Sequence, residues 1–459
     1  MSRLVVISNR VADPRKSATS SLTAALGQTL AADGGLWFGW SGTIVEDGQP
    51  GEGQMHSHQA GKVRLITVDL CRQDHDSYYL GYGNAVLWPV LHGRLDMADF
   101  DASHIDGYRR VNQLLARKLL PLLRTDDILW VHNYHLIPMA AELRAMGCRN
   151  RIGFFLHTPL PPPQILAALP QHAWLMRCLF AYDLAGFQSR ADLANFAQYA
   201  EHEAGAQVLG AQQFRAFGRR IQAQVLPFGI DVQEFSALSQ SREANDTYAR
   251  IKQQYAQRRL LLGVERLDYS RGLPQRLKAF HQLLKKYPEN LQRTALLQIA
   301  SPSHKAPDAT HLRQKLDALC DAINSDFGDL DWMPVRYIHR NVSRKRLPGL
   351  YRAAAVALVT PLCDGVSLMA KEFIAAQDPA NPGVLVLSRF TGAAEQLEEA
   401  MLVNPYDTVG MADSLQQALQ MPLIERQRRH RLLLARLRSQ DVHWWCQAFL
   451  SALAECVPE

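Results

Sequence analysis

The sequence predicts an α/β fold with two doubly wound, Rossmann-like halves, each a parallel sheet covered by helices. Short continuous apolar runs recur along the 459 residues and alternate with amphipathic stretches, the pattern of buried parallel strands and their crossover helices. The chain is too long for one ordinary core. A polar stretch, Leu238–Tyr255, interrupts the alternation and leaves halves of similar size. Two domains of one architecture are therefore expected.

The predicted strands share an apolar, often β-branched run that is bounded by polar or turn residues. They are Leu4–Ser8, Val63–Val68, Ile128–His132, Ile152–His157, Leu184–Phe187, Ile221–Pro227, Leu260–Val264, Ala295–Ile299, Val335–Ile338, Val356–Thr360, Val384–Ser388 and Met401–Val403. The predicted helices share a helical spacing of apolar residues. They are Asp106–Leu123, Leu136–Met146, Ala191–Glu203, Leu273–Lys286, His311–Asn324, Arg344–Ala354, Lys371–Ala376 and Asp407–Gln420. These elements place domains at residues 1–238 and 239–440, followed by a final helix at 441–459.

Composition narrows the class of protein. Hydrophobic residues make up 47% and charged residues 20%, and the formal net charge of +6 is not gathered into a long Lys/Arg run, so nucleic-acid binding is not expected. The seven cysteines are scattered without a C-x-x-C pair, which argues against a disulfide framework or a zinc site and for a reducing compartment. The first residues lead directly into a strand, so we expect no signal peptide, no membrane span and a cytoplasmic location.

The most informative segment is Leu358–Glu372, in which a β-branched run ends at Thr-Pro, passes an Asp-Gly turn and enters a helix. In an α/β fold, the exposed N–H groups at such a helix start form an anion site beside the strand end. Asp364 lies on the loop and Glu372 about two turns into the helix. The two carboxylates are therefore placed to hold hydroxyls on either side of a diphosphate, and this combination describes a nucleotide sugar.

A second segment, Val264–Pro274, carries Arg266 and Arg271 at a strand-to-helix junction. Two guanidiniums there would neutralise a diphosphate leaving group and stabilise the charge that grows as a sugar–phosphate bond breaks. The alternative is a pair of surface arginines in a loop.

Polar side chains also follow the strands of the first half. Arg10 ends the first strand, and its permanently charged guanidinium suits a phosphate. His132, His135 and His157 lie at or just past two further strand ends, where structural and functional roles are equally open; no local acidic partner or His-x-x-x-His spacing supports zinc. Tyr79 and Trp88 offer aromatic surface that suits the C–H faces of a sugar, with core packing as the alternative.

Together these segments resemble the trehalose-6-phosphate synthase family, retaining glycosyltransferases of family 20 with the GT-B architecture. The matching pieces run in order from the first strand to the last: Leu4–Arg10, Gly34–Gly42, Asn84–Pro89, Gly107–Asn112, Trp130–Leu136, Arg151–Pro161, Val264–Pro274, Thr360–Glu372 and Ala375–Gly383. The resemblance implies two facing domains with an interdomain cleft. The first domain would bind the acceptor, the second would bind the nucleotide-sugar donor, and the final helix would cross back to the first.

The resemblance also implies an activity, the transfer of glucose from a nucleoside-diphosphate glucose, UDP-glucose above all, to glucose 6-phosphate. It implies a front-face mechanism, in which the leaving phosphate takes the proton of the attacking hydroxyl, and neither a metal nor a tightly bound cofactor. Partners would be these small-molecule substrates; the family's habit of self-association leaves a homo-oligomer open. The implied catalytic residues are His157, Arg266, Arg271 and Asp364; the donor-binding residues are Arg266, Arg271, Val342, Leu368, Met369 and Glu372; the acceptor-binding residues are Arg10, Ser21, Tyr79, Trp88, Asn133 and His304.

The chain departs from the family pattern mainly on the acceptor side. Ser20 and Ser21 stand where the family has a glycine pair, Asn133 stands for an aspartate and His304 for an arginine. On the donor side, Arg271 stands for a lysine. Two alternatives therefore stay open. One keeps the donor and changes the acceptor, as in glucosylglycerol-phosphate synthesis or a pseudo-glycosyl coupling. The other is a catalytically weak relative that binds a nucleotide sugar.

Overall fold

The computed structural model describes residues 2–12, 26–27, 29–30, 34–49, 51–210, 212–302 and 309–456, and these form two compact units. Unit 1 consists of Met1–Phe228 and His443–Glu459, and unit 2 of Gly229–Val442. The polar composition predicted a boundary after residue 238. The structure places it earlier, between Phe228 and Gly229. The polar stretch is not a linker, because most of it forms helix α10 (Arg242–Gln254), whose Ala244, Thr247 and Ile251 are buried in unit 2.

Unit 1 is built on one twisted sheet whose strand order, within the described residues, is β3-β4-β2-β1-β5-β6-β7-β10-β9-β8. Strands from β4 to β10 in this order run parallel, while β3, β9 and β8 pair antiparallel at the two edges. The strands are β1 (Leu4–Arg10), β2 (Gly35–Val45), β3 (Met55–Ala60), β4 (Val63–Cys71), β5 (Ile128–His132), β6 (Arg151–Phe155), β7 (Leu184–Phe187), β8 (Gln207–Gly210), β9 (Gln213–Ala216) and β10 (Arg219–Val225).

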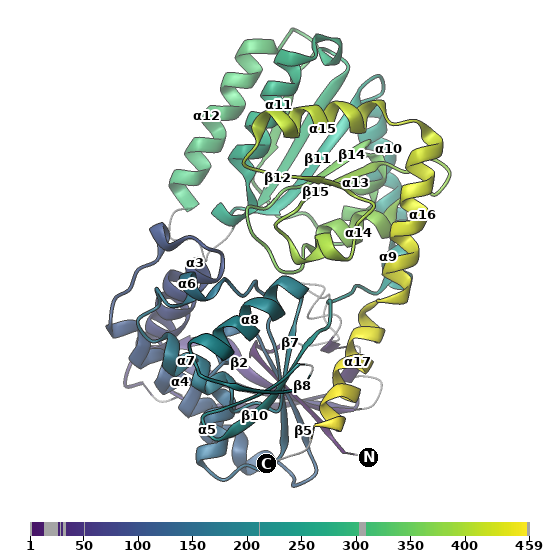
Figure 1. Cartoon of the computed structure of the whole chain (residues 1–459). Helices are drawn as coiled ribbons and strands as arrows, with labels where there is room; N and C mark the ends of the chain where they lie inside the picture. The colour runs from purple at the N-terminus through teal and green to yellow at the C-terminus, as the bar shows by residue number, and fades with distance from the viewer. Residues whose placement is uncertain are drawn as a thin grey trace. The chain divides into compact units, whose positions relative to one another are not determined.

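The helices of unit 1 lie between these strands and cover the sheet (Figure 1). The longer ones have buried apolar stripes, among them Val111, Leu115 and Leu119 of α4. They are η1 (His75–Leu87), α4 (Ser103–Leu119), α5 (Met139–Ala145), α7 (His172–Leu179), α8 (Arg190–His202) and α17 (Val442–Glu455), with short turns at α2 (Arg72–Asp74), α3 (Trp88–Leu91), η2 (Leu95–Met97), η3 (Leu120–Leu122), η4 (Tyr134–Leu136) and α6 (Pro163–Leu166).

Helix α17 packs on the strands of unit 1 through two fully buried aromatic rings. The Trp445 ring centroid lies 4.7 Å from that of Trp130, and the Phe449 centroid lies 4.4 Å from the same ring. Gly153 of β6 makes this approach possible, because a Cβ at that position would lie 2.7 Å from the Phe449 ring. The last helix is thus part of the core of unit 1.

Unit 2 contains an all-parallel sheet in the order β13-β12-β11-β14-β15-β16. Its strands are continuous apolar runs, as expected for a sheet buried on both faces. They are β11 (Arg259–Arg266), β12 (Thr294–Ser301), β13 (Val335–Ile338), β14 (Val356–Val359), β15 (Val384–Ser388) and β16 (Met401–Val403).

Two separate hydrophobic clusters cover the two faces of the unit 2 sheet (Figure 1). On one face lie α11 (Leu273–Lys286), α12 (Ala309–Phe327) and α15 (Thr408–Gln420). On the other lie α9 (Val232–Ser239), α10, α13 (Leu347–Ala353), α14 (Leu368–Ala376) and α16 (Leu423–Ser439). Short 3₁₀ turns occur at η5 (Tyr269–Arg271), η6 (Pro288–Asn290) and η7 (Gly392–Glu395). Within the described ranges, no helix combines the length and the apolar character that a membrane crossing requires.

The predicted strands and helices are confirmed, with ends that differ by a few residues. The sequence did not predict β2, whose glycines and tryptophans interrupt an aliphatic run, nor β3, a polar edge strand with exposed side chains. It also missed α16, in which Arg-rich turns obscure a narrow stripe formed by His430, Leu433 and Leu437.

Candidate functional site

Chemically active side chains gather at the carboxyl ends of the parallel strands in both units, the edge at which doubly wound sheets bind ligands. We call Glu265, Arg266, Arg271, Asp364 and Glu372 the unit 2 cluster. We call Arg10, Tyr79, Trp88, Asn133 and His157 the unit 1 cluster. The residues of the unit 2 cluster lie at the end of β11 or after β11 and β14, and those of the unit 1 cluster lie at the end of β1 or after β4, β5 and β6.

A buried ion pair forms the centre of the unit 2 cluster. Arg271 Nη1 lies 2.7 Å from Asp364 Oδ2, and each side chain is about 10% exposed. Although burial opposes ionisation of this arginine, Asp364 and Glu265 raise the pKa of Arg271 above its ordinary value, so the guanidinium stays charged. Its Nε is buried and lacks a hydrogen-bond partner among the described residues. A buried guanidinium N–H of this kind is a donor that an oxygen-rich ligand would satisfy.

The turn that carries Arg271 is fixed by short hydrogen bonds and by one glycine. Asp268 Oδ1 accepts from Ser270 N and Ser270 Oγ at 2.8 and 2.7 Å. Gly272 then adopts a φ of 65°, and a Cβ there would lie 2.2 Å from the carbonyl oxygen of Thr360. Only glycine fits this left-handed position, which brings the β11 loop against the β14 loop.

Asp364 also organises the start of helix α14. Its Oδ2 accepts from Ser367 N at 3.0 Å and from Ser367 Oγ at 2.7 Å, and Ser367 Oγ lies 2.8 Å from Thr391 Oγ1. Ser367 has a φ of 47°, which is uncommon for a residue with a side chain. This strained position turns the chain into α14, whose first residues are Leu368 and Met369. Their N–H groups belong to the first turn, where the helix dipole favours an anion.

A second layer of charge lies behind the Arg271–Asp364 pair. Burial raises the pKa of Glu265, and the nearby Arg271 and Arg276 partly offset this effect. Arg276 is fully buried and donates to Thr360 Oγ1 and Gln298 Oε1 at 3.1 and 3.0 Å, while its Nη2 lies 3.7 Å from Glu265 Oε1. Arg266, at the end of β11, is exposed.

Glu372 is buried on α14, where the Tyr351 hydroxyl donates to its Oε2 at 3.3 Å. Burial raises the pKa of Tyr351, and the charge of Glu372 adds to that shift. The adjacent Lys371 is also buried; burial lowers its pKa to about 7, and its Nζ donates to Gln396 Oε1 at 2.5 Å. Val342 lies on the loop after β13, half-buried against the same core.

In the unit 1 cluster, the end of β1 presents Arg10 beside a glycine. Trp37 Nε1 donates to Ser8 Oγ at 2.8 Å, and Ser8 Oγ donates to the carbonyl of Arg10 at 2.9 Å, which fixes the backbone of the arginine. Gly42 has a φ of 89°, and a Cβ there would lie 2.7 Å from Arg10 Nη2. The glycine therefore leaves room for the guanidinium, which lies 6.0 Å from the Trp40 ring centroid.

Aromatic rings line the neighbouring part of the unit 1 cluster. Tyr79 stacks on His135 with centroids 5.6 Å apart and 20° between the planes, and also contacts Trp40. Trp88 lies 3.9 Å from the His92 ring. Tyr79 belongs to η1, a helix with π-type hydrogen bonding, a feature that is frequently found at functional sites.

Asn133 follows β5 in a strained conformation, with φ 74° and ψ 163°. Its Oδ1 accepts from Tyr134 N at 3.0 Å, and its own N donates to the carbonyl of Phe155 at 2.8 Å. The acceptor atom of the amide is thus engaged by the backbone. The Nδ2 group is the part of this side chain that remains to donate to a ligand.

His157 forms a hydrogen-bonded pair with His132, in which His132 Nδ1 lies 3.2 Å from His157 Nε2. Burial lowers the pKa of His157 to about 3 and lowers that of His132 well below its ordinary value. Both rings are therefore neutral near pH 7, and a neutral imidazole offers one donor and one acceptor. Phe155, Phe228 and Trp445 surround His157 and hold its ring in place.

The structure brings the predicted residues together in two sets, each within its own unit. Ser20, Ser21 and His304 lie outside the described residues. Sequence reasoning missed Glu265, Ser367 and Gly42. Glu265 and Ser367 lie inside segments that were singled out, but a buried carboxylate and a left-handed serine carry no distinct sequence signal.

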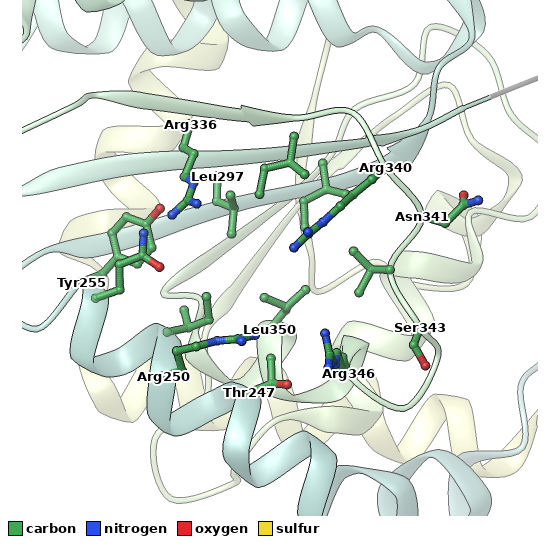
Figure 2. Close-up of a pocket in the computed structure, with 15 residues that line it drawn as sticks. Thr247, Arg250, Tyr255, Leu297, Arg336, Arg340, Asn341, Ser343, Arg346 and Leu350 are labelled. Carbon is green, nitrogen blue, oxygen red and sulfur yellow. The ribbon is translucent and has the colours of Figure 1, made fainter.

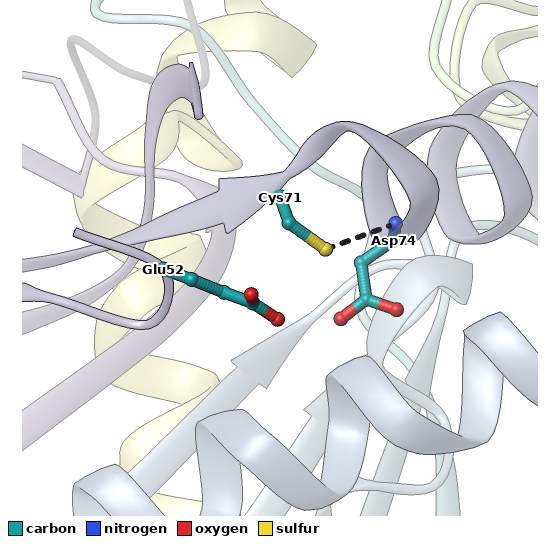
Figure 3. Close-up of side chains that lie close together, drawn as sticks. All are labelled: Glu52, Cys71 and Asp74. Atoms are coloured by element: carbon teal, nitrogen blue, oxygen red, sulfur yellow. Dashed lines mark hydrogen bonds between the residues drawn. The ribbon is translucent and has the colours of Figure 1, made fainter. Parts of the chain in front are cut away.

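A further group of three side chains in unit 1 has the composition of a metal site. Glu52, Cys71 and Asp74 offer ligand atoms that all lie within 4.8 Å of one another (Figure 3). However, Asp74 N donates to Cys71 Sγ at 3.4 Å, and the Asp74 carboxylate pairs with Arg110 at 2.9 Å. Burial raises the pKa of the Cys71 thiol to about 12, so it stays protonated near neutral pH. These contacts explain the cluster without a metal.

Comparison with known proteins places these features in a family. The model of glycosyltransferase family 20 matches residues 6–455. The chain is 44% identical to a trehalose-6-phosphate synthase of Klebsiella pneumoniae and 43% identical to one of Sinorhizobium fredii, over 100% and 99% of its length and 96% and 98% of theirs.

Solved structures agree over nearly the whole chain. One is an α,α-trehalose-phosphate synthase (UDP-forming) from Burkholderia xenovorans in complex with glucose-6-phosphate, with TM-score 0.93, 43% identity and coverage of 98% of this chain and 100% of that one. Another, from E. coli and bound with UDP-2-fluoro glucose, has TM-score 0.95, 42% identity and full coverage of both chains. The predicted α/β fold of the GT-B class, with two parallel-sheet domains, is confirmed. The chain belongs to glycosyltransferase family 20.

Proposed function

We propose that this enzyme is a retaining glucosyltransferase that forms α,α-trehalose 6-phosphate from UDP-glucose and glucose 6-phosphate. The observation that carries the proposal is the Arg271–Asp364 pair, in which a charged guanidinium keeps one buried N–H unsatisfied beside the first turn of α14. A diphosphate supplies the oxygens that this donor needs. Relatives bound with UDP-2-fluoro glucose and with glucose-6-phosphate support the choice of substrates.

On the donor side, Arg266 and Arg271 neutralise the diphosphate. Arg271 is positioned before the ligand arrives, since Asp364 and the η5 turn hold it, and such preorganisation makes electrostatic stabilisation effective. The N–H groups of Leu368 and Met369 add donors at the helix start. Glu372 holds the ribose hydroxyls, and the backbone near Val342 contacts the base.

Asp364 and His157 bind the hydroxyls of the glucose that is transferred. Asp364 Oδ2 is engaged by Arg271 and Ser367, so this carboxylate is held as an acceptor and is poorly placed to act as a nucleophile. Neutral His157 donates or accepts a hydrogen bond without adding charge near the reacting carbon.

The acceptor contacts Arg10, Ser21, Tyr79, Trp88, Asn133 and His304. Arg10 binds the phosphate of glucose 6-phosphate, since Gly42 leaves its guanidinium accessible and the Ser8 hydrogen bonds fix its backbone. Tyr79 and Trp88 give the sugar ring apolar surface.

The chemistry follows a front-face path. The bond between the glucose C1 and the diphosphate oxygen breaks as the acceptor hydroxyl forms a bond to C1 on the same face. The departing phosphate oxygen receives the proton of that hydroxyl, so UDP leaves and the configuration at C1 is retained. Arg266 and Arg271 stabilise the negative charge that grows on the diphosphate. We place the reaction in the cytoplasm, since all seven cysteines are free thiols.

A second candidate keeps UDP-glucose and changes the acceptor. It is favoured by Asn133, because the Oδ1 that would accept from a sugar hydroxyl is occupied by Tyr134 N. An acceptor that lacks the hydroxyl facing Asn133 Oδ1 would therefore bind as well as glucose 6-phosphate.

The purified protein should be incubated with UDP-glucose and glucose 6-phosphate, and UDP and trehalose 6-phosphate should be assayed together. Equal amounts of both products are expected. UDP release that glucose 6-phosphate does not stimulate would favour the second candidate. Tight UDP-glucose binding in calorimetry, with no transfer to any sugar phosphate, would contradict an enzymatic role.

A further inference from the structure

Unit 2 contains a cavity of about 350 Å³ that the proposed reaction leaves unused over most of its surface (Figure 2). It lies on the face of the sheet covered by α10 and α13, next to the edge strand β13. Its walls are one face of α10, the strands β12 and β13, the loop after β13, and the first turns of α13. The lining residues are Thr247, Arg250, Ile251, Gln254, Tyr255, Leu297, Ile299, Arg336, Ile338, Arg340, Asn341, Val342, Ser343, Arg346 and Leu350.

The lining is strongly positive. Four arginines, Arg250, Arg336, Arg340 and Arg346, reach toward this cavity from four different places in the fold, and none of the described residues that line it is acidic (Figure 2). In the part of the chain that the structure describes, none of the four guanidiniums forms an ion pair with a carboxylate. Like charges brought together without a counterion repel one another, and a bound anion would relieve that repulsion.

Two arginines near the cavity, in contrast, are paired with oxygen atoms of neighbouring residues. Arg344 pairs with Glu234, with Nη2 3.0 Å from Oε2. Arg352 of α13 donates to the carbonyl of Ser239 and to Asn245 Oδ1 at 2.8 and 2.7 Å. Among the described residues, the four cavity arginines have no such contacts with oxygen atoms of acidic or amide side chains, and Arg336 contacts only the neutral hydroxyl of Tyr255. Their charge is left for a ligand.

The floor of the cavity is apolar. Leu297 and Ile299 of β12 alternate onto this face, and Ile338 of β13 lies beside Ile299 in register. Ile251 and Leu350 close it from α10 and α13. Arg336 is the register partner of Leu297, so a charged group stands directly at the edge of the apolar floor. A ligand that fits has an apolar or aromatic body and negative charges at its periphery.

One end of the cavity meets the proposed donor site. Val342 lines the cavity and is also our proposed contact for the base. Leu350 lines it as well, and the next residue, Tyr351, donates to Glu372 at 3.3 Å. The other end, formed by Arg250, Gln254, Tyr255 and Arg336, lies where α10 meets β13.

We propose that this cavity is a regulatory site for a small organic polyanion with an apolar or aromatic body, such as a phosphorylated metabolite, and that it can be filled while the donor is bound. The site takes at least two separated negative charges, because the arginines stand on opposite walls. Its occupant orders the loop that carries Val342 and thereby strengthens donor binding. This second part rests on the proposed function, and the first does not.

The test uses naphthalene-1,5-disulfonate as the probe, with calorimetry on the full chain. The disulfonate is expected to bind one site per chain, and naphthalene-1-sulfonate to bind about tenfold more weakly, because it lacks one charge-assisted contact. The double variant Arg250→Gln/Arg336→Gln should weaken disulfonate binding about a hundredfold. The matched control is Arg242→Gln, an exposed arginine on the same helix, which should change nothing. Circular dichroism checks that each variant is folded.

UDP separates the proposed site from the donor site. Saturating UDP should leave the disulfonate bound, whereas competitive displacement would mean that the two ligands share one site and would overturn the proposal. UDP-glucose should bind about threefold more tightly with the probe present, and an unchanged affinity would overturn the coupling. Arg266→Ala should weaken UDP-glucose binding and keep probe binding. Failure of the donor assignment and failure of the cavity assignment therefore give different results.

Discussion

The unit 2 cluster holds opposite charges in direct contact, whereas the unit 1 cluster holds neutral rings and an amide beside one arginine. In unit 2, Arg271 and Asp364 are buried together, with Glu265 behind them. In unit 1, the paired histidines are kept neutral, and Asn133 replaces the carboxylate that the family resemblance predicts. The first region is arranged to receive a multiply charged group, and the second to position a sugar with little change in charge.

Because of this difference, we expect the two clusters to respond differently to substitution. A buried ion pair ties binding to folding, since removing one partner leaves the other charge uncompensated. Neutral, aromatic surfaces contribute through shape and tolerate exchange of polar groups. Changes at the buried Arg271–Asp364 pair should therefore affect stability and binding together, and changes at the polar groups that face the acceptor should act mainly on substrate use.

The largest effect is expected from Arg271→Leu. It leaves Asp364 buried without its cation, so the free energy of unfolding should fall by about 3–5 kcal/mol. Urea denaturation measures this. The double variant Arg271→Leu/Asp364→Asn should recover a large part of the loss. Equal destabilisation of the single and double variants would mean that the pair is not coupled.

Arg266→Ala should act on binding without acting on the fold, because Arg266 is exposed at the end of β11. Loss of a charge-assisted contact to a phosphate costs about 1.5–3 kcal/mol, which is roughly a ten- to hundredfold rise in the UDP-glucose dissociation constant. Calorimetry measures it, and Arg313→Ala, a half-exposed arginine on α12, is the control. Unchanged affinity would place the diphosphate elsewhere.

The histidine pair predicts acid sensitivity in unit 1. The pKa of His157 is about 3 in the folded state, below its ordinary value, so the unfolded chain binds this proton more readily. Stability should therefore be complete above a pH of about 6.5 and fall below it, by at most about 1.4 kcal/mol per pH unit for this one group. Urea midpoints at several pH values measure the slope. His157→Gln should make it shallower, and His202→Gln, an exposed control, should leave it as it is. Equal slopes in all three proteins would contradict a neutral His157 in the folded state.

The smallest effect is expected from Asn133→Asp. Aspartate keeps the bond from Tyr134 N and tolerates the positive φ, and it adds a charged acceptor. The KM for glucose 6-phosphate should fall by about fivefold, which corresponds to roughly 1 kcal/mol. Steady-state kinetics with each substrate varied in turn would show it. A KM that does not move would mean that position 133 does not limit use of this acceptor.

Much of the fold was predictable, because its strands are continuous apolar runs and its long helices keep their period. Strand β3 was not, since its exposed side chains carry no alternation, and α10 was not predicted because only one narrow stripe of it is buried. The positions of Asp364, Arg271 and Arg10 followed from their place at strand ends. The proton-sharing of His132 with His157, the left-handed Ser367 and the room that Gly42 leaves for Arg10 depend on contacts between distant segments. No local pattern records them.

The packing of α17 has a consequence for how the molecule is made. Trp445 and Phe449 are synthesised after the whole of unit 2, yet they complete the core around Trp130 and Gly153, which were synthesised far earlier. The nascent first unit must therefore wait, with an uncovered aromatic surface, while the whole of the second unit emerges and folds. During this delay chaperones can bind the uncovered surface, and aggregation competes with folding.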